Sequence, residues 1–212
     1  MAYTTIDKPT DYFNTKLYTG DGSTNAITGV GHQPDWVWIK SRSQSRNHKI
    51  FDSVRGVTKV IGSNETDAET TVATSLTAFG SDGFTVSSDV SVNESSEPFV
   101  AWNWKAGTSF SNSSGSNGAN LDSSGSVSTT AGISIVSFTG NRSTTRNIYH
   151  GLGAVPKIMI FKNRSATNGW TIYHEAIGNA KKLTLNSTAV AGNCTACFAS
   201  TDPTSTLFSV GD

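Results

Sequence analysis

The sequence predicts an all-β protein made of two tandem antiparallel β-sandwich domains, and three observations carry this prediction. Ser, Thr and Asn together make up about a third of the 212 residues, while 15 % are charged and 35 % hydrophobic, which favours short strands and polar turns over long amphipathic helices. Apolar runs recur roughly every ten residues between turn residues. The chain also repeats its own pattern, as tandem architectures do.

The first half of the chain contains the expected strands of one sandwich. These short runs lie at residues 14–19, 25–28, 35–41, 48–51, 70–79, 84–87 and 98–104. Gly20-Asp21-Gly22-Ser23 and Ser81-Asp82-Gly83 are typical turns, because Gly adopts positive φ at no cost and Asp tolerates it. No segment keeps a helical period for more than about two turns, so residues 52–61 and 174–183 have room for one short helix each.

A second copy of this pattern follows the first. GVGHQPDWVWIKSRS, which begins at Gly29, aligns with GLGAVPKIMIFKNRS, which begins at Gly151, at an offset of 122 residues. The same offset aligns IFDSVRG with IYHEAIG, which begins at Ile172. Slightly different offsets align YTGDGS with FTGNRS and GFTVSSD with LFSVGD. We interpret this as a duplicated domain with small insertions in its loops.

The repeat predicts the limits of the domains. Residues 1–11 form an N-terminal arm, residues 12–106 the first sandwich, residues 107–131 a linker, and residues 132–212 the second sandwich. The linker consists of small polar residues, and we expect it to be extended and mobile in part. The second copy lacks a counterpart of the segment EPFVAWNWKAG. We therefore expect its C-terminal strand to come either from a longer polypeptide or from a neighbouring chain.

Charge and hydropathy exclude several classes of partner. The formal net charge is zero, with 16 basic and 16 acidic residues, so the chain has little positive field with which to hold nucleic acid or an anionic membrane. The opening MAYTTIDKPTDYF has no signal-peptide pattern, and the apolar runs are far shorter than the roughly 18 residues of a membrane span. We expect a protein made in the cytoplasm without membrane insertion.

Four tryptophans invite a carbohydrate-binding interpretation, because sugar rings stack on exposed indoles. They stand in two strands, as Trp36, Trp38, Trp102 and Trp104. The run WVWI is apolar on both faces, and its counterpart in the second copy is the aliphatic run IMIF. Burial explains both copies, whereas sugar stacking explains only one, so we expect these indoles to fill the core.

The sequence offers no convincing cofactor or metal site. Cys194 and Cys197 have the spacing of half a zinc site, but the chain has no further cysteine, and its four histidines show no paired spacing. Residues three apart on a strand point to opposite faces, so we expect two reduced cysteines rather than a disulfide. Calcium would need clustered carboxylates, and the loop carboxylates are scattered in the sequence, at Asp82, Asp89 and Glu94.

The search for catalytic residues gives one weak candidate. His174 precedes Glu175, where the first copy has Asp52 and Ser53, and no familiar nucleophile or metal motif accompanies the pair. We interpret both as surface residues and predict no enzyme activity. The basic residues between Arg42 and Lys49 are interpreted as a solvated hairpin tip rather than a phosphate site.

Taken as a set, the motifs of both copies resemble a known domain. They include MAYTTIDKPTDYFNTKLYTGDGS, GVGHQPDWVWIK, SDGFTV, VAWNWKAG, TAGISIVSFTGN and HGLGAVPKIMIFKNRS. Together they resemble a tandem domain of unknown function found in virion structural proteins of marine tailed bacteriophages, over nearly the whole chain outside the linker. The resemblance implies a jelly-roll or concanavalin-like sandwich in a tail fibre or appendage, and it carries over no catalytic residues.

Three functional hypotheses follow. The first is a non-enzymatic virion component, in a tail fibre, an appendage or the capsid surface, that contacts other virion proteins and symmetry-related copies of itself. The second is a module that binds a host receptor or glycan through loops such as those beside Gly22 and Asn141. The third is a glycan-degrading enzyme, which would need two carboxylates about 5 to 10 Å apart in one cleft.

Overall fold

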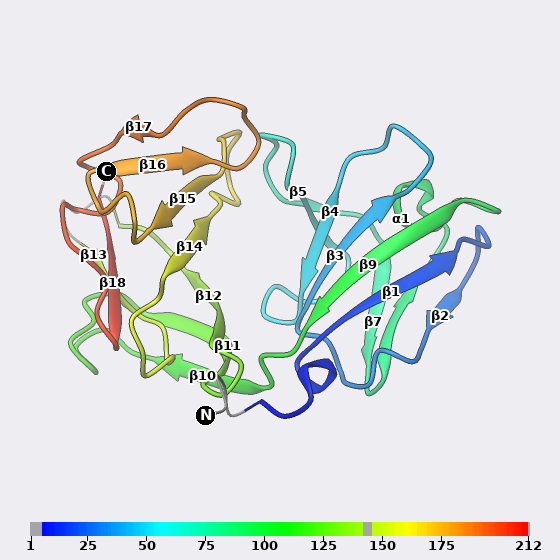
Figure 1. The fold of residues 1–212 in the computed structure, drawn as a ribbon, viewed down its shortest axis with the longest axis horizontal. Helices are drawn as coiled ribbons and strands as arrows, with labels where there is room; N and C mark the ends of the chain where they lie inside the picture. The colour runs from blue at the N-terminus through cyan, green and yellow to red at the C-terminus, as the bar shows by residue number, and fades with distance from the viewer. Residues whose placement is uncertain (1–5, 142–145, 212) are drawn as a thin grey trace. The chain divides into compact units, whose positions relative to one another are not determined.

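The computed structural model describes residues 6–141 and 146–211, and nearly all of its regular structure is β (Figure 1). The helical structure in these residues consists of η1 (Pro9–Asp11) and α1 (Val90–Asn93). Every paired strand is antiparallel, in several sheets of the kind expected for β-sandwiches. The predicted all-β class is therefore confirmed. The short helices expected at 52–61 and 174–183 were wrong, since these segments form turns and strand ends.

The chain divides into two compact units. Unit 1 comprises Met1–Gly107 together with Arg164–Ala166, and unit 2 comprises Thr108–Asn163 together with Thr167–Asp212. The units are defined by contacts in space, whereas the two copies are defined by the sequence repeat. The domain limits derived from the repeat remain a prediction.

Unit 1 has two sheets. The six-stranded sheet runs in the order β1 (Phe13–Thr19), β9 (Pro98–Trp104), β3 (Trp36–Ser41), β4 (Lys49–Asp52), β5 (Lys59–Gly62) and β6 (Thr70–Thr71). The three-stranded sheet runs in the order β2 (Asn25–Ile27), β8 (Gly83–Val86) and β7 (Leu76–Gly80). Both sheets contribute to one hydrophobic core, in which Val37, Ile39 and Phe99 are fully buried.

Two adjacent strands of the six-stranded sheet, β3 and β9, bury every second side chain. Burial alternates along β3 and β9, so that one face of each strand points to the core and the other points away. On the facing sheet, Leu76, Phe84 and Val86 supply the matching buried side chains. Tyr18 packs from β1, and its hydroxyl donates to Val92 O at 2.5 Å.

Unit 2 contains the remaining strands. Its sheets consist of β10 (Thr108–Asn112), β11 (Ser123–Ser128) and β12 (Ile133–Phe138); of β13 (Arg146–Tyr149) and β18 (Leu207–Val210); and of β14 (Ile158–Phe161), β15 (Thr171–His174), β16 (Lys181–Thr184) and β17 (Gly192–Asn193). Leu121, Ile148 and Phe208 form a buried hydrophobic cluster in this unit.

The segment 107–131 is not the extended linker that its composition predicts. It forms β10 and β11, which pair with each other and then with β12. A few apolar residues supply the buried surface that this polar segment needs in order to fold. Leu121 belongs to the hydrophobic cluster of unit 2, and Val127 is buried. Small residues such as Gly125 let the strands approach closely, because a Cβ there would lie 2.2 Å from Ile135 O.

The two copies share one pattern of strand pairing. Trp36 faces Asp52 across β3 and β4, and the residues 122 positions later, Ile158 and His174, face each other across β14 and β15. The same offset relates the pairing of β4 with β5 to that of β15 with β16, and the pairing of β5 with β6 to that of β16 with β17. The pairing of β2 with β8 has its counterpart in β13 and β18.

Candidate functional site

The tryptophans form a row on the outer face of the six-stranded sheet of unit 1. Trp36 lies opposite Trp104 and Trp38 lies opposite Trp102 in the pairing of β3 with β9. Their rings meet edge to face, with centroids 6.3 Å and 6.0 Å apart respectively. On β1, Phe13 continues the row, with its ring 4.8 Å from that of Trp104 and 37 % of its surface exposed.

This position corrects the expectation that the indoles fill the core. All four tryptophans are only partly buried, whereas their neighbours Val37, Ile39 and Ala101 are fully buried on the opposite face. In WVWI both alternating sets are apolar, so either could have faced inward. The structure places the smaller set in the core and leaves an aromatic surface outside.

Polar contacts fix one end of the aromatic row. Trp38 Nε1 donates to His48 Nδ1 at 3.0 Å, which requires His48 to be neutral at that nitrogen. Burial lowers the pKa of His48, and the charge of Lys40 lowers it further. At the other end, the indole nitrogen of Trp36 is buried without a hydrogen-bond partner.

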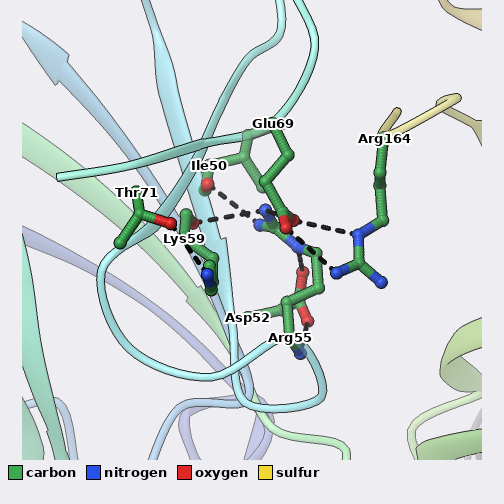
Figure 2. Close-up of polar contacts among 7 residues, drawn as sticks. All are labelled: Ile50, Asp52, Arg55, Lys59, Glu69, Thr71 and Arg164. Atoms are coloured by element: carbon green, nitrogen blue, oxygen red, sulfur yellow. Dashed lines mark hydrogen bonds and ion pairs between the residues drawn. The ribbon is translucent and has the colours of Figure 1, made fainter. Parts of the chain in front are cut away.

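A network of charged side chains surrounds Arg55 (Figure 2). One of its members, Asp52, lies opposite Trp36 in the pairing of β3 with β4. The Arg55 side chain, 6 % exposed, pairs with Asp52 through Nε and with Glu69 Oε2 at 3.1 Å through Nη1. Nη1 also donates to Lys59 O at 3.2 Å, and Nη2 donates to Ile50 O at 3.0 Å. Four of the five N–H donors of this guanidinium therefore have an acceptor, which offsets the cost of burying its charge.

Glu69 also binds a second arginine. Arg164, which belongs to unit 1 by its contacts, donates to the two Glu69 oxygens from Nε and Nη2, each at 3.0 Å. Burial acts to raise the pKa of Glu69, but the hydrogen bonds from Arg164 and Arg55 outweigh it, so the pKa lies below its ordinary value. Glu69 therefore joins Arg55 and Arg164 in one hydrogen-bonded cluster.

The loop between β1 and β2, which contains Gly22, is held by one buried amide. Asn93 Oδ1 accepts from the Asp21 N–H at 3.1 Å, and Asn93 Nδ2 donates to Ser23 O at 2.7 Å and to Ser87 O at 2.9 Å. Hydrogen bonds from the Ser23 N–H and from Asn93 lower the pKa of Asp21. The corresponding loop of the second copy continues from Asn141 into residues 142–145, which lie outside the described residues.

The scattered carboxylates each have a structural partner. Asp82 accepts from the Gly31 N–H at 2.6 Å and the Gly29 N–H at 2.9 Å, and these bonds lower its pKa. Asp89 accepts from the Ser91 N–H at the start of α1. Glu94 forms an ion pair with Arg46. In residues 6–141 and 146–211, no group of three or more His, Cys, Asp or Glu side chains could hold a metal ion.

The remaining candidates from the sequence are separate from one another. Glu175 forms an ion pair with Lys157, and His174 Nδ1 accepts from the Ala176 N–H at 3.1 Å, so neither is arranged to activate the other. In the basic hairpin, Lys49 Nζ lies 2.8 Å from Glu65 Oε2, and with Arg46 also paired, this hairpin offers no concentrated positive charge.

Cys194 and Cys197 form a disulfide, which corrects the expectation of reduced cysteines. They lie in a turn that follows β17 rather than within a strand, and the Cys197 N–H donates to Cys194 O at 3.3 Å. The turn brings their Cα atoms to 5.4 Å, within the usual range for a disulfide. The argument from opposite strand faces fails because the strand ends at Asn193.

Comparison with known proteins adds a family and no function. The profile of a family described as a domain of unknown function, DUF7483, matches residues 8–212. No curated protein and no solved structure matches the chain. Among the described residues, no helix is long and apolar enough to cross a membrane.

Proposed function

We propose that this chain, which belongs to the DUF7483 family of domains of unknown function, is a non-enzymatic structural protein of a bacteriophage particle. It acts through assembly contacts with other particle proteins and with copies of itself, as part of a tail fibre, an appendage or the capsid surface. The phage assignment derives from the resemblance of its motifs to virion structural proteins.

The observation that carries the assembly role is the exposed apolar edge of unit 2. β14 is the last strand of its sheet, and two of its side chains, Ile158 and Ile160, are 55 % and 40 % exposed. Sheet edges with exposed apolar side chains pair readily with other chains, and stable monomers usually protect them. Such an edge supports a protein whose partner completes it.

Two further features support this role. Glu175, the acidic member of the one catalytic pair that the sequence offers, forms an ion pair with Lys157. The Cys194–Cys197 disulfide persists best outside the reducing cytosol, and virion surfaces are among the places where disulfides occur.

The test is the protein content of the purified particle. We expect mass spectrometry of density-purified virions to find this chain in a fixed ratio to the major capsid protein. A phage enzyme made early in infection serves as the control for cytoplasmic carry-over. The proposal fails if the chain is abundant in infected cells and the virions contain no more of it than of that control.

A second candidate function is glycan binding by the aromatic row, which the partial exposure of the indoles favours. Sugar rings stack on such surfaces through their apolar faces. We expect the chain to bind host surface glycans on an array, and Trp102→Ala to weaken this binding at least tenfold. The matched control is Thr85→Ala on the other sheet, and equal binding by both variants would reject this candidate.

A further inference from the structure

In unit 1 the strand β9 lies between β1 and β3 and pairs with both. Its seven residues, PFVAWNW, carry no charge. Phe99 and Ala101 point into the core, while Trp102 and Trp104 point to the outer face. A single uncharged strand with alternating apolar side chains therefore completes this side of the first sandwich.

Unit 2 has the two strands that should flank such a strand but not the strand itself. β14 corresponds to β3 by its pairing, and β12 corresponds to β1 by the sequence repeat. Both are terminal strands of their sheets: β12 pairs with β11, and β14 pairs with β15. In the described part of the chain, no strand pairs with both of them.

β12 and β14 border one core, as β1 and β3 do. The ring of Phe138 from β12 and the ring of Phe161 from β14 lie 5.8 Å and 5.5 Å from the ring of Phe208. In unit 1 the corresponding Tyr18 contacts Phe84, but it also stacks on Phe99 of β9 at 5.2 Å. Unit 2 thus has the aromatic contacts with Phe208, but the described residues contain no counterpart of the stacking between Tyr18 and Phe99.

The unpaired edge of β14 has a defined direction. The Glu175 N–H donates to Lys157 O at 3.0 Å, so Lys157 and, by alternation, Met159 and Phe161 direct their main-chain groups toward β15. The N–H and C=O groups of Ile158 and Ile160 therefore point away from β15. In unit 1 the equivalent edge of β3 is the one paired with β9.

The side chains of β14 are less buried than those of β3, as expected for a strand that lacks a neighbour equivalent to β9. Val37 and Ile39 of β3 are fully buried, while their counterparts Met159 and Phe161 are only partly buried. The outward side chain at position 160 is exposed, whereas that of Trp38 is partly buried beside β9. The core of unit 2 is therefore least covered where the equivalent of β9 would lie.

We propose that the free edge of β14 takes up one extended, uncharged strand that is not part of residues 6–141 or 146–211, paired antiparallel to β14 and carrying alternating apolar side chains as β9 does. Strand addition of this kind is a common mode of peptide recognition. Every described strand of this chain already belongs to a sheet, so none of them is left over to fill this edge. The inference names the kind of contact through which the proposed assembly role operates.

The test uses the whole chain and a peptide with the sequence of residues 97–105, EPFVAWNWK. Hydrogen exchange followed by NMR reports on the amides of Ile158 and Ile160. We expect saturating peptide to slow their exchange at least tenfold and to leave β3, which already has β9, unchanged. A peptide with Val100→Pro is the control, because in unit 1 residue 100 directs its main-chain groups toward β3 and proline lacks the N–H.

A variant of the chain gives the complementary control. Ile160→Pro removes an N–H that points away from β15, so it leaves the existing sheet intact and abolishes the effect of the peptide. Ile160→Val keeps the N–H and retains the effect. The proposal is overturned if the peptide leaves exchange unchanged, or if both amides are already protected in a dimeric chain, since a second copy would then occupy the edge.

These results are independent of the virion test. A chain that is found in particles but ignores the peptide would refute the strand contact alone. A chain that binds the peptide but is absent from particles would keep the strand contact and refute the phage role.

Discussion

Asn93 is the side chain on which the loop between β1 and β2 depends. Asn93 is fully buried. Its Oδ1 accepts a hydrogen bond from the Asp21 N–H, and its Nδ2 donates to Asp21 Oδ1 and to the carbonyl oxygen of Ser87, just after β8. A buried polar group that loses its partner costs roughly 1 to 3 kcal/mol, more than an ordinary hydrogen bond contributes.

We therefore expect Asn93→Ala to lower the free energy of unfolding by about 1 to 3 kcal/mol, because the Asp21 N–H and Ser23 O lose a partner. Denaturant unfolding of the purified variant measures this change. Ser95→Ala, in the exposed turn two residues later, is the control and should stay within about 0.5 kcal/mol of the native chain. Equal stability of the two variants would contradict the role of Asn93.

Three histidines make stability depend on pH. Burial lowers the pKa of His32, His48 and His150 below the ordinary value of about 6.5. Between the unfolded and folded pKa values, the unfolded chain binds more protons than the folded chain, so acidification favours unfolding.

We expect the free energy of unfolding to fall as the pH is lowered from 7.5 to 5.5, a range in which ordinary carboxylates stay ionised. Thermal unfolding across this range gives the measurement. A variant with His32→Asn and His150→Asn should show a shallower pH dependence. An unchanged slope in this variant would show that the buried histidines do not cause the effect.

At the scale of residues, sequence reasoning located the aromatic strands but expected the tryptophans to be buried, whereas they lie partly exposed on the outer face. Alternation in WVWI defines two faces, yet both are apolar, so hydropathy alone cannot decide which one points inward. The fully buried Val37 and Ile39 decide it in the structure. The Asn93 contacts were missed because they join residues about seventy positions apart, and no local pattern marks such a contact.

At the scale of elements, the turn after β17 is closed by the Cys194–Cys197 disulfide. A disulfide stabilises a fold mainly by lowering the conformational entropy of the unfolded chain. The loop closed here is short, so this stabilisation is modest. Cys194 is also anchored by its N–H, which donates to Ala180 O at 2.8 Å, so the turn keeps other contacts when the bond is reduced.

We expect Cys194→Ser with Cys197→Ser to lower the free energy of unfolding of unit 2 by about 2 kcal/mol, without loss of the fold. Chemical denaturation with and without a phosphine reductant measures the effect. The native chain should respond to the reductant and the double variant should not. A native chain that is insensitive to the reductant would show that the cysteines are not paired.

The elements were predicted unevenly, for physical reasons. The strands of the first copy could be found because turn residues separate short apolar runs. β10 and β11 could not be found from their own composition, because a polar segment becomes a strand here by pairing with β12 and by burying a few residues such as Val127. Tertiary pairing of this kind overrides local propensity.

At the scale of the whole molecule, the two units differ in how well their cores are buried. The unit 1 core contains fully buried side chains from both of its sheets, including Leu76, Phe84 and Phe99 at 2 % exposure or less. In unit 2, Met159 and Phe161, the counterparts of Val37 and Ile39, pack against the hydrophobic cluster while still partly exposed. Burial of apolar surface is the main favourable contribution to folding, so unit 2 should be the less stable unit.

We expect calorimetry to show two unfolding transitions, with unit 2 melting first. Phe99→Ala should destabilise the later transition and Phe208→Ala the earlier one, each by about 3 to 5 kcal/mol. Each variant serves as the control for the other. A single transition that both variants shift equally would show that the chain unfolds as one cooperative unit.

The shared pairing of the two copies also affects how the gene can vary. Residues 36–62 and 158–184 carry β3 to β5 and β14 to β16 with the same spacing between partners. A crossover between these two stretches of coding sequence would keep the pairing of β3 to β5 in register across the junction. A product with one copy would nevertheless lose β9 and leave β1 without its partner, so a change of copy number keeps this hairpin but not the whole sheet.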